Sequence, residues 1–147
     1  MKNLYLLPTN NPSRLVKFFT NKFHLCKEIL PIQDEEQYHQ VYIISNEEIK
    51  EGDWRLDIRN GDVYKSNKND SELYDNTYRK KIILTTNKLL IEDGIQEISE
   101  DFLEWFVKNP TCESVELKPW FNEILSCCKS ESECSCNKKR IVLPNNN

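Results

Sequence analysis

The stretch from Arg79 to Leu117 constrains the fold of this chain more than any other. It begins with a β-branched run at Lys81 to Thr86, turns at Asp93 and Gly94, and passes through a short aromatic segment into an alternating run around Val115. A β-branched run favours a strand, whereas apolar residues at helical spacing favour a helix. The stretch therefore predicts a strand, a helix and a second strand that pack as one unit. Because the first strand is apolar on both faces, we expect it in the centre of a sheet.

The helix of this unit is predicted over Ser99 to Lys108. Ser99 is a favourable N-cap, and Glu100 and Asp101 place negative charge near the positive end of the helix dipole. A broad apolar face follows, with Trp105 beside it. This face consists of Phe102, Leu103, Phe106 and Val107. A helix with one apolar face buries that face, so we expect it to cover the sheet.

The segment from Trp54 to Arg59 alternates apolar and charged residues and predicts a half-buried strand. We expect its apolar residues, Trp54, Leu56 and Ile58, on the core side, and its charged residues, Arg55, Asp57 and Arg59, in solvent. Asn60 and Gly61 suit the positive φ angles of a two-residue type I′ turn. This turn predicts a register with Arg59 opposite Asp62, Ile58 opposite Val63, and Asp57 opposite Tyr64.

Shorter apolar runs predict the remaining strands, at Asn3 to Leu7, Val41 to Ile44, around Val115 and Leu117, and at Ile141 to Leu143. A turn is expected at Thr9 to Ser13, and the segment from Gln33 to Gln40 is acidic and polar. The segment from Arg14 to Leu25 fits either a strand or a helix face, and we favour the strand.

The predicted architecture is an α+β domain. It combines a small, strongly twisted antiparallel sheet, or a partly closed barrel, with one short helix as its cover. At 147 residues the chain has a common size for a single domain, so one domain over 1–147 is expected. Polar residues dominate 66–77 and 126–137, which we expect to be exposed loops, and the tail 144–147 is expected to be frayed.

The charge of the chain gives weak support for nucleic-acid binding. The chain carries 20 basic and 24 acidic residues, for a net charge of −4. Binding to a phosphate backbone would require the basic side chains to converge on one face. The candidates are Arg55, Arg59, Lys80 and Lys81. A nucleic-acid-binding small barrel is therefore an alternative, supported mainly by the turn at Gly52 and Asp53, which resembles those that enter strands in such folds.

The sequence contains six cysteines, of which four crowd one polar segment. These four are Cys127, Cys128, Cys134 and Cys136. Four thiolates can complete a tetrahedral zinc shell, but structural zinc sites usually use paired C-x2-C knuckles, which this spacing does not supply. A variable, reduced loop is favoured over a zinc site, and no cofactor is expected. Pairing of these cysteines in a redox reaction is a smaller alternative.

Three other sets of residues are of types that could take part in catalysis or binding. Each set is expected to be structural. His24 and Cys26 are two positions apart and would share a strand face, but no third group orients them as a triad requires. The carboxylates Asp53, Asp57 and Asp62 are expected to close a turn, face solvent and complement Arg59, respectively. The aromatic residues Trp105, Trp120 and Phe121 are expected in the core rather than as a stacking surface.

No export or membrane signal is recognisable in the sequence. The apolar run from Met1 to Leu7 is cut short by Pro8, and no run approaches the roughly 20 apolar residues of a bilayer span. We therefore expect a cytoplasmic protein without a membrane partner.

Four phrases of the sequence form a distinctive set. They are LLPT at Leu6 to Thr9 with Pro12, Ser13 and Arg14, EEIKEGDW at Glu47 to Trp54, KKIILTT at Lys80 to Thr86, and FLEWFVKNP at Phe102 to Pro110 with Cys112 and Glu113. Together they resemble an uncharacterised family of small proteins found in Bacteroidetes and in their tailed phages. The resemblance implies an accessory protein of a phage or its host, located in the host cytoplasm if a phage encodes it. It implies no activity, ligand or catalytic residue.

The function favoured by the sequence is a non-enzymatic module that contacts another protein. Sheet edges and the loops at 66–77 and 126–137 are the expected contact regions. An enzymatic function would need an acid or a thiol in a pocket with a perturbed pKa.

Overall fold

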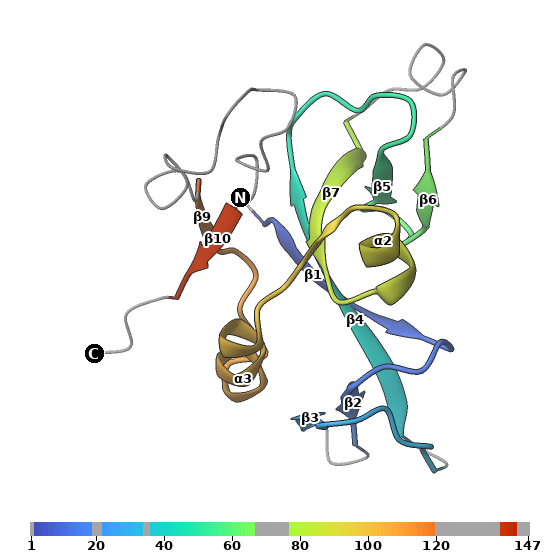
Figure 1. Ribbon diagram of the computed structural model, residues 1–147, viewed down its shortest axis with the longest axis vertical. Helices are drawn as coiled ribbons and strands as arrows, with labels where there is room; N and C mark the ends of the chain where they lie inside the picture. The colour runs from blue at the N-terminus through green and yellow to red at the C-terminus, as the bar shows by residue number, and fades with distance from the viewer. Residues whose placement is uncertain (1, 19–21, 34–35, 67–76, 120–138, 144–147) are drawn as a thin grey trace.

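The computed structural model describes residues 2–18, 22–33, 36–66, 77–119 and 139–143 (Figure 1). The predicted loop at 126–137, the predicted tail at 144–147 and most of the predicted loop at 66–77 lie outside these residues. Of the last loop the structure describes only the two ends, where Ser66 is buried and Thr77 is exposed.

The described residues form two helices and ten strands. In chain order these are β1 (Leu4–Thr9), β2 (Leu15–Lys17), β3 (Phe23–Leu25), β4 (Gln37–Ser45), β5 (Trp54–Asp57), β6 (Val63–Lys65), β7 (Arg79–Thr85), α2 (Lys88–Glu92), β8 (Gln96–Glu97), α3 (Glu100–Lys108), β9 (Glu116–Pro119) and β10 (Lys139–Val142). Strands β1 to β8 form one sheet, and β9 pairs with β10 in a second, two-stranded sheet.

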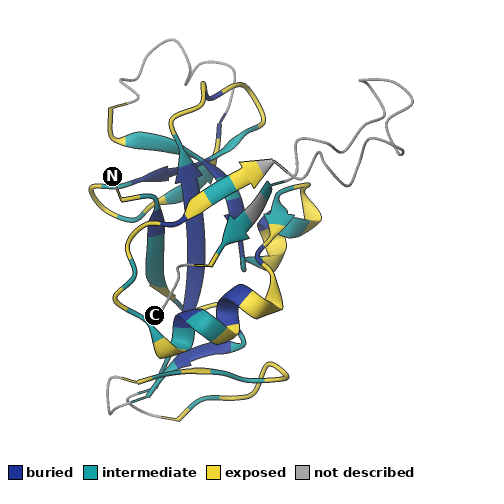
Figure 2. Ribbon diagram, turned by 90° about the vertical axis from the view of Figure 1, so that its left-hand side faces the viewer, coloured by how far each residue is buried: buried dark blue, intermediate teal, exposed yellow. Residues whose placement is uncertain are grey.

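Strand β4 lies at the centre of the large sheet and is buried on both faces (Figure 2). Successive side chains of a strand point to opposite faces. Val41 and Ile43 accordingly enter a first apolar core, while Tyr42 and Ile44 enter a second one on the other face. The sequence prediction of a buried strand at Val41 to Ile44 is confirmed, but β4 begins earlier, at Gln37, because β1 and β2 both pair with its polar end.

Strand β7 confirms the prediction of a central strand and contributes to both cores. Ile82 packs in the second core and Leu84 in the first, although residues two apart on a regular strand share a face. The register with β4 shifts between these positions, because Ile44 lies opposite Ile82 whereas Ile43 lies opposite Leu84. Ile83 is therefore an extra residue, and this β-bulge turns the strand from one core to the other.

The helix α3 covers the first core, as the sequence predicts. Ser99 is its N-cap, with the Phe102 amide donating to the Ser99 hydroxyl at 3.3 Å. Phe102, Leu103 and Phe106 are its buried side chains. Trp105 packs against Phe102 with the ring centroids 5.8 Å apart, in agreement with its predicted core position.

The second core has a cover of its own that the sequence analysis missed. Helix α2 begins after Asn87, whose side-chain oxygen accepts the amide of Leu89 at 3.0 Å. Its Leu90 is 1% exposed and packs with Leu56 and Ile82. One short helix is thus an incomplete description of what covers the sheet.

The sheet is open, so the alternative of a partly closed barrel is wrong. Its strand order is β3-β2-β4-β7-β5-β6, with β1 on β4 and β8 parallel to β7 (Figure 1). The segment from Arg14 to Leu25 contains two short strands, β2 and β3, which form a hairpin and confirm the strand interpretation.

The predicted register of the β5–β6 hairpin is wrong by two residues. Val63 lies opposite Leu56 instead of Ile58, and the amide of Asp57 donates to the carbonyl of Asp62 at 2.8 Å. The connection therefore comprises the four residues 58–61. The Asp57 carboxylate accepts the amide of Arg59 at 3.0 Å, and Gly61, with φ of 79°, closes the turn. This side-chain bond favours the longer loop over a two-residue turn.

The predicted solvent face of β5 is buried instead. Arg55 is 1% exposed and Asp57 is 4% exposed. The Arg55 guanidinium lies over the ring of Tyr64, 4.3 Å from its centroid, so an aromatic ring covers this cation. The guanidinium of Arg59 covers the Asp57 carboxylate, with Arg59 Nη2 at 2.9 Å from Asp57 Oδ2.

Two side-chain amides join the small β9–β10 sheet to the large one. The amide of Asn3, just before β1, donates to the Val115 carbonyl at 3.0 Å and accepts the Val115 amide at 2.9 Å. Gln96 of β8 makes the same pair of bonds with the backbone of Lys139. Each amide thus takes the place of a peptide group in a β-bridge.

We predict that Asn3→Ala destabilises the protein by about 1–3 kcal/mol, because it leaves both polar backbone groups of Val115 without a partner. Urea unfolding followed by fluorescence measures this change. Asn11→Ala is the matched control, since Asn11 is exposed, and its effect should stay within about 0.5 kcal/mol. Equal effects of the two substitutions would contradict the role given to Asn3.

Candidate functional site

The candidate site lies at a gap along one edge of β4. β1 pairs with β4 over Tyr38 to Ile43 and occupies the other edge. The registers of β2 and β7 on β4 both overlap that of β1, so β2 and β7 must share the remaining edge. β2 pairs only with Gln37 to His39, and β7 only with Tyr42 to Ser45. No strand of the described residues therefore lies beside Gln40 and Val41 on this edge.

Three hydroxyl groups and one backbone amide bind the backbone of β4 at this gap. The amide of Thr86, just past the end of β7, donates to the Val41 carbonyl at 3.1 Å. The hydroxyl of Ser13 donates to the His39 carbonyl at 2.7 Å. The hydroxyl of Thr86 accepts the Val41 amide at 2.9 Å, and that of Thr85 donates to the Val41 carbonyl at 2.9 Å. Buried backbone groups need such partners, so these three side chains stabilise the interruption of the sheet.

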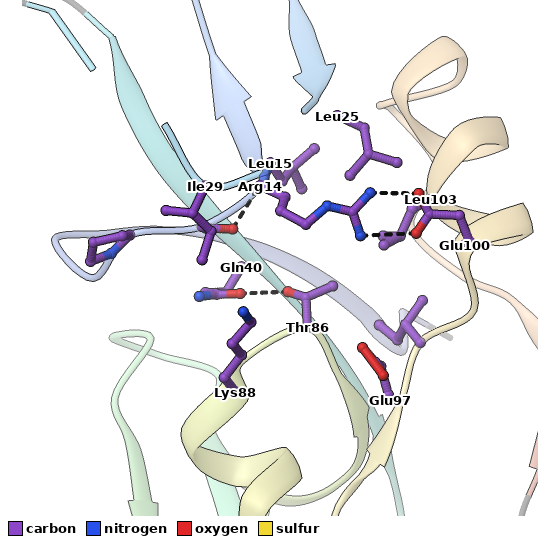
Figure 3. Close-up of a pocket in the computed structure, with 13 residues that line it drawn as sticks. Arg14, Leu15, Leu25, Ile29, Gln40, Thr86, Lys88, Glu97, Glu100 and Leu103 are labelled. Carbon is purple, nitrogen blue, oxygen red and sulfur yellow. Dashed lines mark hydrogen bonds and ion pairs between the residues drawn. The ribbon is translucent and has the colours of Figure 1, made fainter. Parts of the chain in front are cut away.

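A cavity of about 230 Å³ opens over the gap (Figure 3). Apolar side chains form much of its wall, namely Pro12, Leu15, Leu25, Ile29, Ile98 and Leu103. Polar side chains form the rest, namely Ser13, Arg14, Gln40, Thr86, Lys88, Glu97 and Glu100. The cavity thus combines residues from β2, β4, α2, β8 and α3.

The hydrogen bonds of Gln40 determine how its side-chain amide is oriented. The Thr86 hydroxyl already accepts the Val41 amide, and it lies 2.6 Å from the Gln40 Oε1 atom. This distance is typical of a hydroxyl that donates to an oxygen and is short for an N–H donor. The carbonyl of Gln40 therefore faces Thr86, and its amide nitrogen points away from Thr86 (Figure 3).

A forked ion pair closes the end of the cavity near α3. The two terminal nitrogens of Arg14 donate to the two carboxylate oxygens of Glu100 at 2.9 and 2.5 Å, and Arg14 Nε donates to the Cys26 carbonyl at 2.7 Å. Glu100 lies in the first turn of α3, where the helix dipole favours a negative charge. The hydrogen bonds from Arg14 lower the pKa of the Glu100 carboxyl below its ordinary value of 4.5.

The lining of the cavity does not combine a nucleophile with a base. The lining contains no His or Cys among the residues that the structure describes, and the hydroxyls of Ser13 and Thr86 already donate to acceptors in the protein. The pKa of Glu100 is lowered, whereas a general acid at neutral pH needs a raised pKa. This arrangement is suited to binding through fixed polar and apolar groups.

The four basic residues predicted from the sequence do not share one exposed face. Arg55 and Lys81 lie opposite each other on β5 and β7, but Arg55 is buried under Tyr64. Lys80 lies opposite Leu56 and therefore on the other face of the sheet. Arg59 is exposed.

The charged groups of this region are also paired with carboxylates. Arg59 binds Asp57, and its hydrogen bonds lower the pKa of the Asp57 carboxyl. Lys81 lies 3.7 Å from the carboxylate of Asp53, which also accepts the amide of Lys50 at 2.7 Å and so closes a turn as predicted. The predicted partner of Arg59, Asp62, is replaced by Asp57.

The remaining sequence candidates form no reactive group in the described part of the chain. The exposed ring of His24 stacks on Phe18, with centroids 4.0 Å apart, and Cys26 follows after the end of β3. No cluster of His, Cys, Asp or Glu suited to a metal ion occurs among the described residues. The four clustered cysteines, Cys127, Cys128, Cys134 and Cys136, lie outside the described residues, as do Trp120 and Phe121.

Gln40, Lys88 and the Arg14–Glu100 pair were not predicted from the sequence. The available signals were weak. Gln40 directly precedes an apolar strand, and Lys88 follows a run of two Thr residues and an Asn. Neither pattern predicts that the two segments lie beside the same gap.

Comparison with known proteins found no family model, no curated protein and no solved structure that matches this chain. Among the described residues, neither helix has the length and apolar character that crossing a bilayer requires. The residues of the cavity are therefore the main guide to function.

We predict that the Arg14–Glu100 pair contributes about 0.2–1 kcal/mol to stability near neutral pH, the range for partly exposed ion pairs. Because the pKa of Glu100 is lower in the folded than in the unfolded protein, this contribution is present above pH 4.5 and is lost as the pH falls through the folded pKa. Urea unfolding of the wild type and of Glu100→Gln over this pH range measures the loss.

Glu104→Gln is the matched control, since Glu104 is exposed on the same helix. Glu100→Gln should remove stability only above the folded pKa of Glu100, and Glu104→Gln should leave the pH profile unchanged. The contrary result is a difference in the free energy of unfolding between the wild type and Glu100→Gln that is the same at every pH, including pH values below 4.5. That result would show that the ion pair does not set this pH dependence.

Proposed function

We propose that this protein is a non-enzymatic interaction module that holds a segment of another protein in the cavity between β2 and β7. The observation that carries this proposal is the interrupted edge of β4, where the hydroxyls of Ser13, Thr85 and Thr86 and the backbone amide of Thr86 bind the exposed backbone groups. The interruption leaves a preformed cavity with both apolar and hydrogen-bonding walls. Binding sites for other molecules commonly have this mixed character.

Exposed apolar side chains near the cavity support contact with a protein. Ile29 lines the cavity and is 38% exposed, and its neighbour Leu30 is 51% exposed. Leu89, which follows the lining residue Lys88, is 61% exposed. An exposed apolar side chain on the wall of a cavity is typical of a surface that a partner covers.

The walls of the cavity are held in place by long-range contacts. The Tyr38 hydroxyl donates to the Leu30 carbonyl at 2.5 Å and fixes the segment that carries Ile29. Arg14 joins the start of β2 to the chain after β3 and to α3. A preorganised site loses less conformational entropy on binding. These contacts therefore favour the cavity over the edge strands β3 and β6, which have three residues each.

The biological setting of the proposal rests on the resemblance to small proteins of Bacteroidetes and their tailed phages. On this basis the protein is an accessory factor of a phage or its host, and its partner is another protein in the cytoplasm. The phrases that carry the resemblance include Pro12, Ser13 and Arg14, which also line the cavity.

Binding of nucleic acid is the weaker alternative. Affinity for a phosphate backbone depends on accessible cations on a common face. Arg55 is buried, and Lys80 lies on the opposite face of the sheet from Lys81. A zinc site at the clustered cysteines is a separate alternative, which elemental analysis of the purified protein tests.

We predict that peptides selected from a random display library will depend on Ile29. The library should present peptides in both orientations, with free N-termini and with free C-termini. Ile29→Asp should lower the affinity of the selected peptides by about tenfold or more, because it removes apolar contact area at the mouth of the cavity and introduces a charge. Isothermal titration calorimetry measures the affinities.

Leu143→Asp is the matched control, because Leu143 is 43% exposed and follows β10 in the other sheet. It should change the affinities by less than about twofold. Failure to select any peptide, or selected peptides that are insensitive to Ile29→Asp, would contradict the proposed function.

We predict no saturable binding of short single- or double-stranded DNA or RNA at about 50 mM salt, measured by fluorescence anisotropy. The four candidate cations are buried, paired or on different faces, so they cannot together neutralise a row of phosphates. Saturable binding that weakens steeply with added salt and is lost in Lys80→Gln/Lys81→Gln would favour the nucleic-acid alternative instead.

A further inference from the structure

The cavity between β2 and β7 contains hydrogen-bond donors without acceptors. Gln40 is 4% exposed, and its amide nitrogen has no hydrogen-bond partner among the described residues. Lys88 forms no ion pair with any described carboxylate, and Figure 3 shows its ammonium group on the same side of the cavity as Gln40. The Glu100 carboxylate is paired with Arg14, whose two terminal nitrogens donate to its two oxygens.

The side-chain nitrogen of Gln40 is open to solvent in the cavity, because it is not one of the fully buried polar atoms that lack a partner. A ligand that binds this nitrogen must therefore replace the hydrogen bonds that water makes there. A group that accepts hydrogen bonds is therefore the complement of Gln40. The charge of Lys88 favours a negatively charged acceptor, since hydrogen bonds that involve two charged groups are the stronger ones. These two residues together are suited to a carboxylate.

The facing wall is suited to an apolar side chain. Leu15, Leu25 and Leu103 line the cavity, and Leu15 and Leu103 are largely buried, at 1% and 6% exposure. The volume of about 230 Å³ is below the roughly 300–1,000 Å³ of typical small-molecule pockets. The cavity thus has room for a group the size of one amino-acid residue.

We propose that the cavity holds the C-terminal residue of a partner polypeptide, with its carboxylate on Gln40 and Lys88 and its apolar side chain against Leu15, Leu25 and Leu103. This inference rests on the proposed function and adds the chemistry of the segment that is bound. In a C-terminal residue the carboxylate and the side chain branch from the same carbon atom, so both reach one small cavity.

An internal Asp or Glu fits the cavity less well. Its carboxylate is the end of the side chain, which leaves no apolar group on the same residue to contact the leucines. The C-terminal residue also has a backbone N–H, and the Glu97 carboxylate on the cavity wall is an acceptor for it. A C-terminal apolar residue therefore uses the donors, the acceptor and the apolar wall together.

Titrations of the isotope-labelled full-length protein with small probes, followed by NMR, test this inference. The probes are N-acetyl-L-leucine, N-acetyl-L-leucinamide, N-acetylglycine and the α-amide of N-acetyl-L-glutamate, which carries its carboxylate on the side chain. The signal to follow is the side-chain NH2 group of Gln40, assigned by its loss in Gln40→Met. N-acetyl-L-leucine should shift this signal and bind about tenfold more tightly than each of the other three probes.

Lys88→Met should raise the Kd of N-acetyl-L-leucine by about tenfold. Lys108→Met, which removes an exposed lysine at the end of α3, should change this Kd by less than about twofold. If N-acetyl-L-leucine and N-acetyl-L-leucinamide bind equally, the cavity does not recognise a carboxylate. If N-acetylglycine binds as tightly as N-acetyl-L-leucine, the cavity does not recognise an apolar side chain. Absence of any shift at Gln40 would overturn the inference as a whole. Displayed peptides with blocked C-termini that still depend on Ile29 would leave the proposed function intact in each case.

Discussion

The structure depends on the burial of β4 on both faces. Val41 and Ile43 belong to one core and Tyr42 and Ile44 to the other, so this one strand links the two halves of the domain. Burial of apolar area is the main driving force of folding. A strand that is apolar on both faces buries apolar area on each of them, so both faces stabilise the fold. Both faces must then be covered, and α3 covers the first while α2 covers the second. The bulge at Ile83 lets β7 follow β4 into both cores.

The candidate site is a consequence of this arrangement. β4 is nine residues long, and the short strand β2 leaves its shared edge incomplete before β7 begins. Three hydroxyls satisfy the backbone there at little cost in space, and the unfilled volume becomes a cavity. Gln40 lies at the middle of the gap, which explains why a polar side chain of a central strand is buried and still faces open space.

Local patterns in the sequence were sufficient for many elements. The N-cap at Ser99 and the apolar face after it specified α3, and the β-branched run specified β7. The same reasoning was wrong for the β5–β6 hairpin, because a side-chain bond from Asp57 favours a longer turn than Asn60 and Gly61 alone indicate. It was also wrong for Arg55, since alternation cannot reveal that an aromatic ring covers the charged face of a strand.

The sequence by itself determined the apolar face of α3 and the buried runs of β4 and β7, because strand and helix periods are properties of neighbouring residues. Only the tertiary structure decided that β2 and β7 share an edge of β4, and that Arg14, Gln40, Lys88 and Glu100 surround one cavity. These residues come from segments far apart in the chain. Their proximity follows from the packing of two cores around a single strand, which no local pattern encodes.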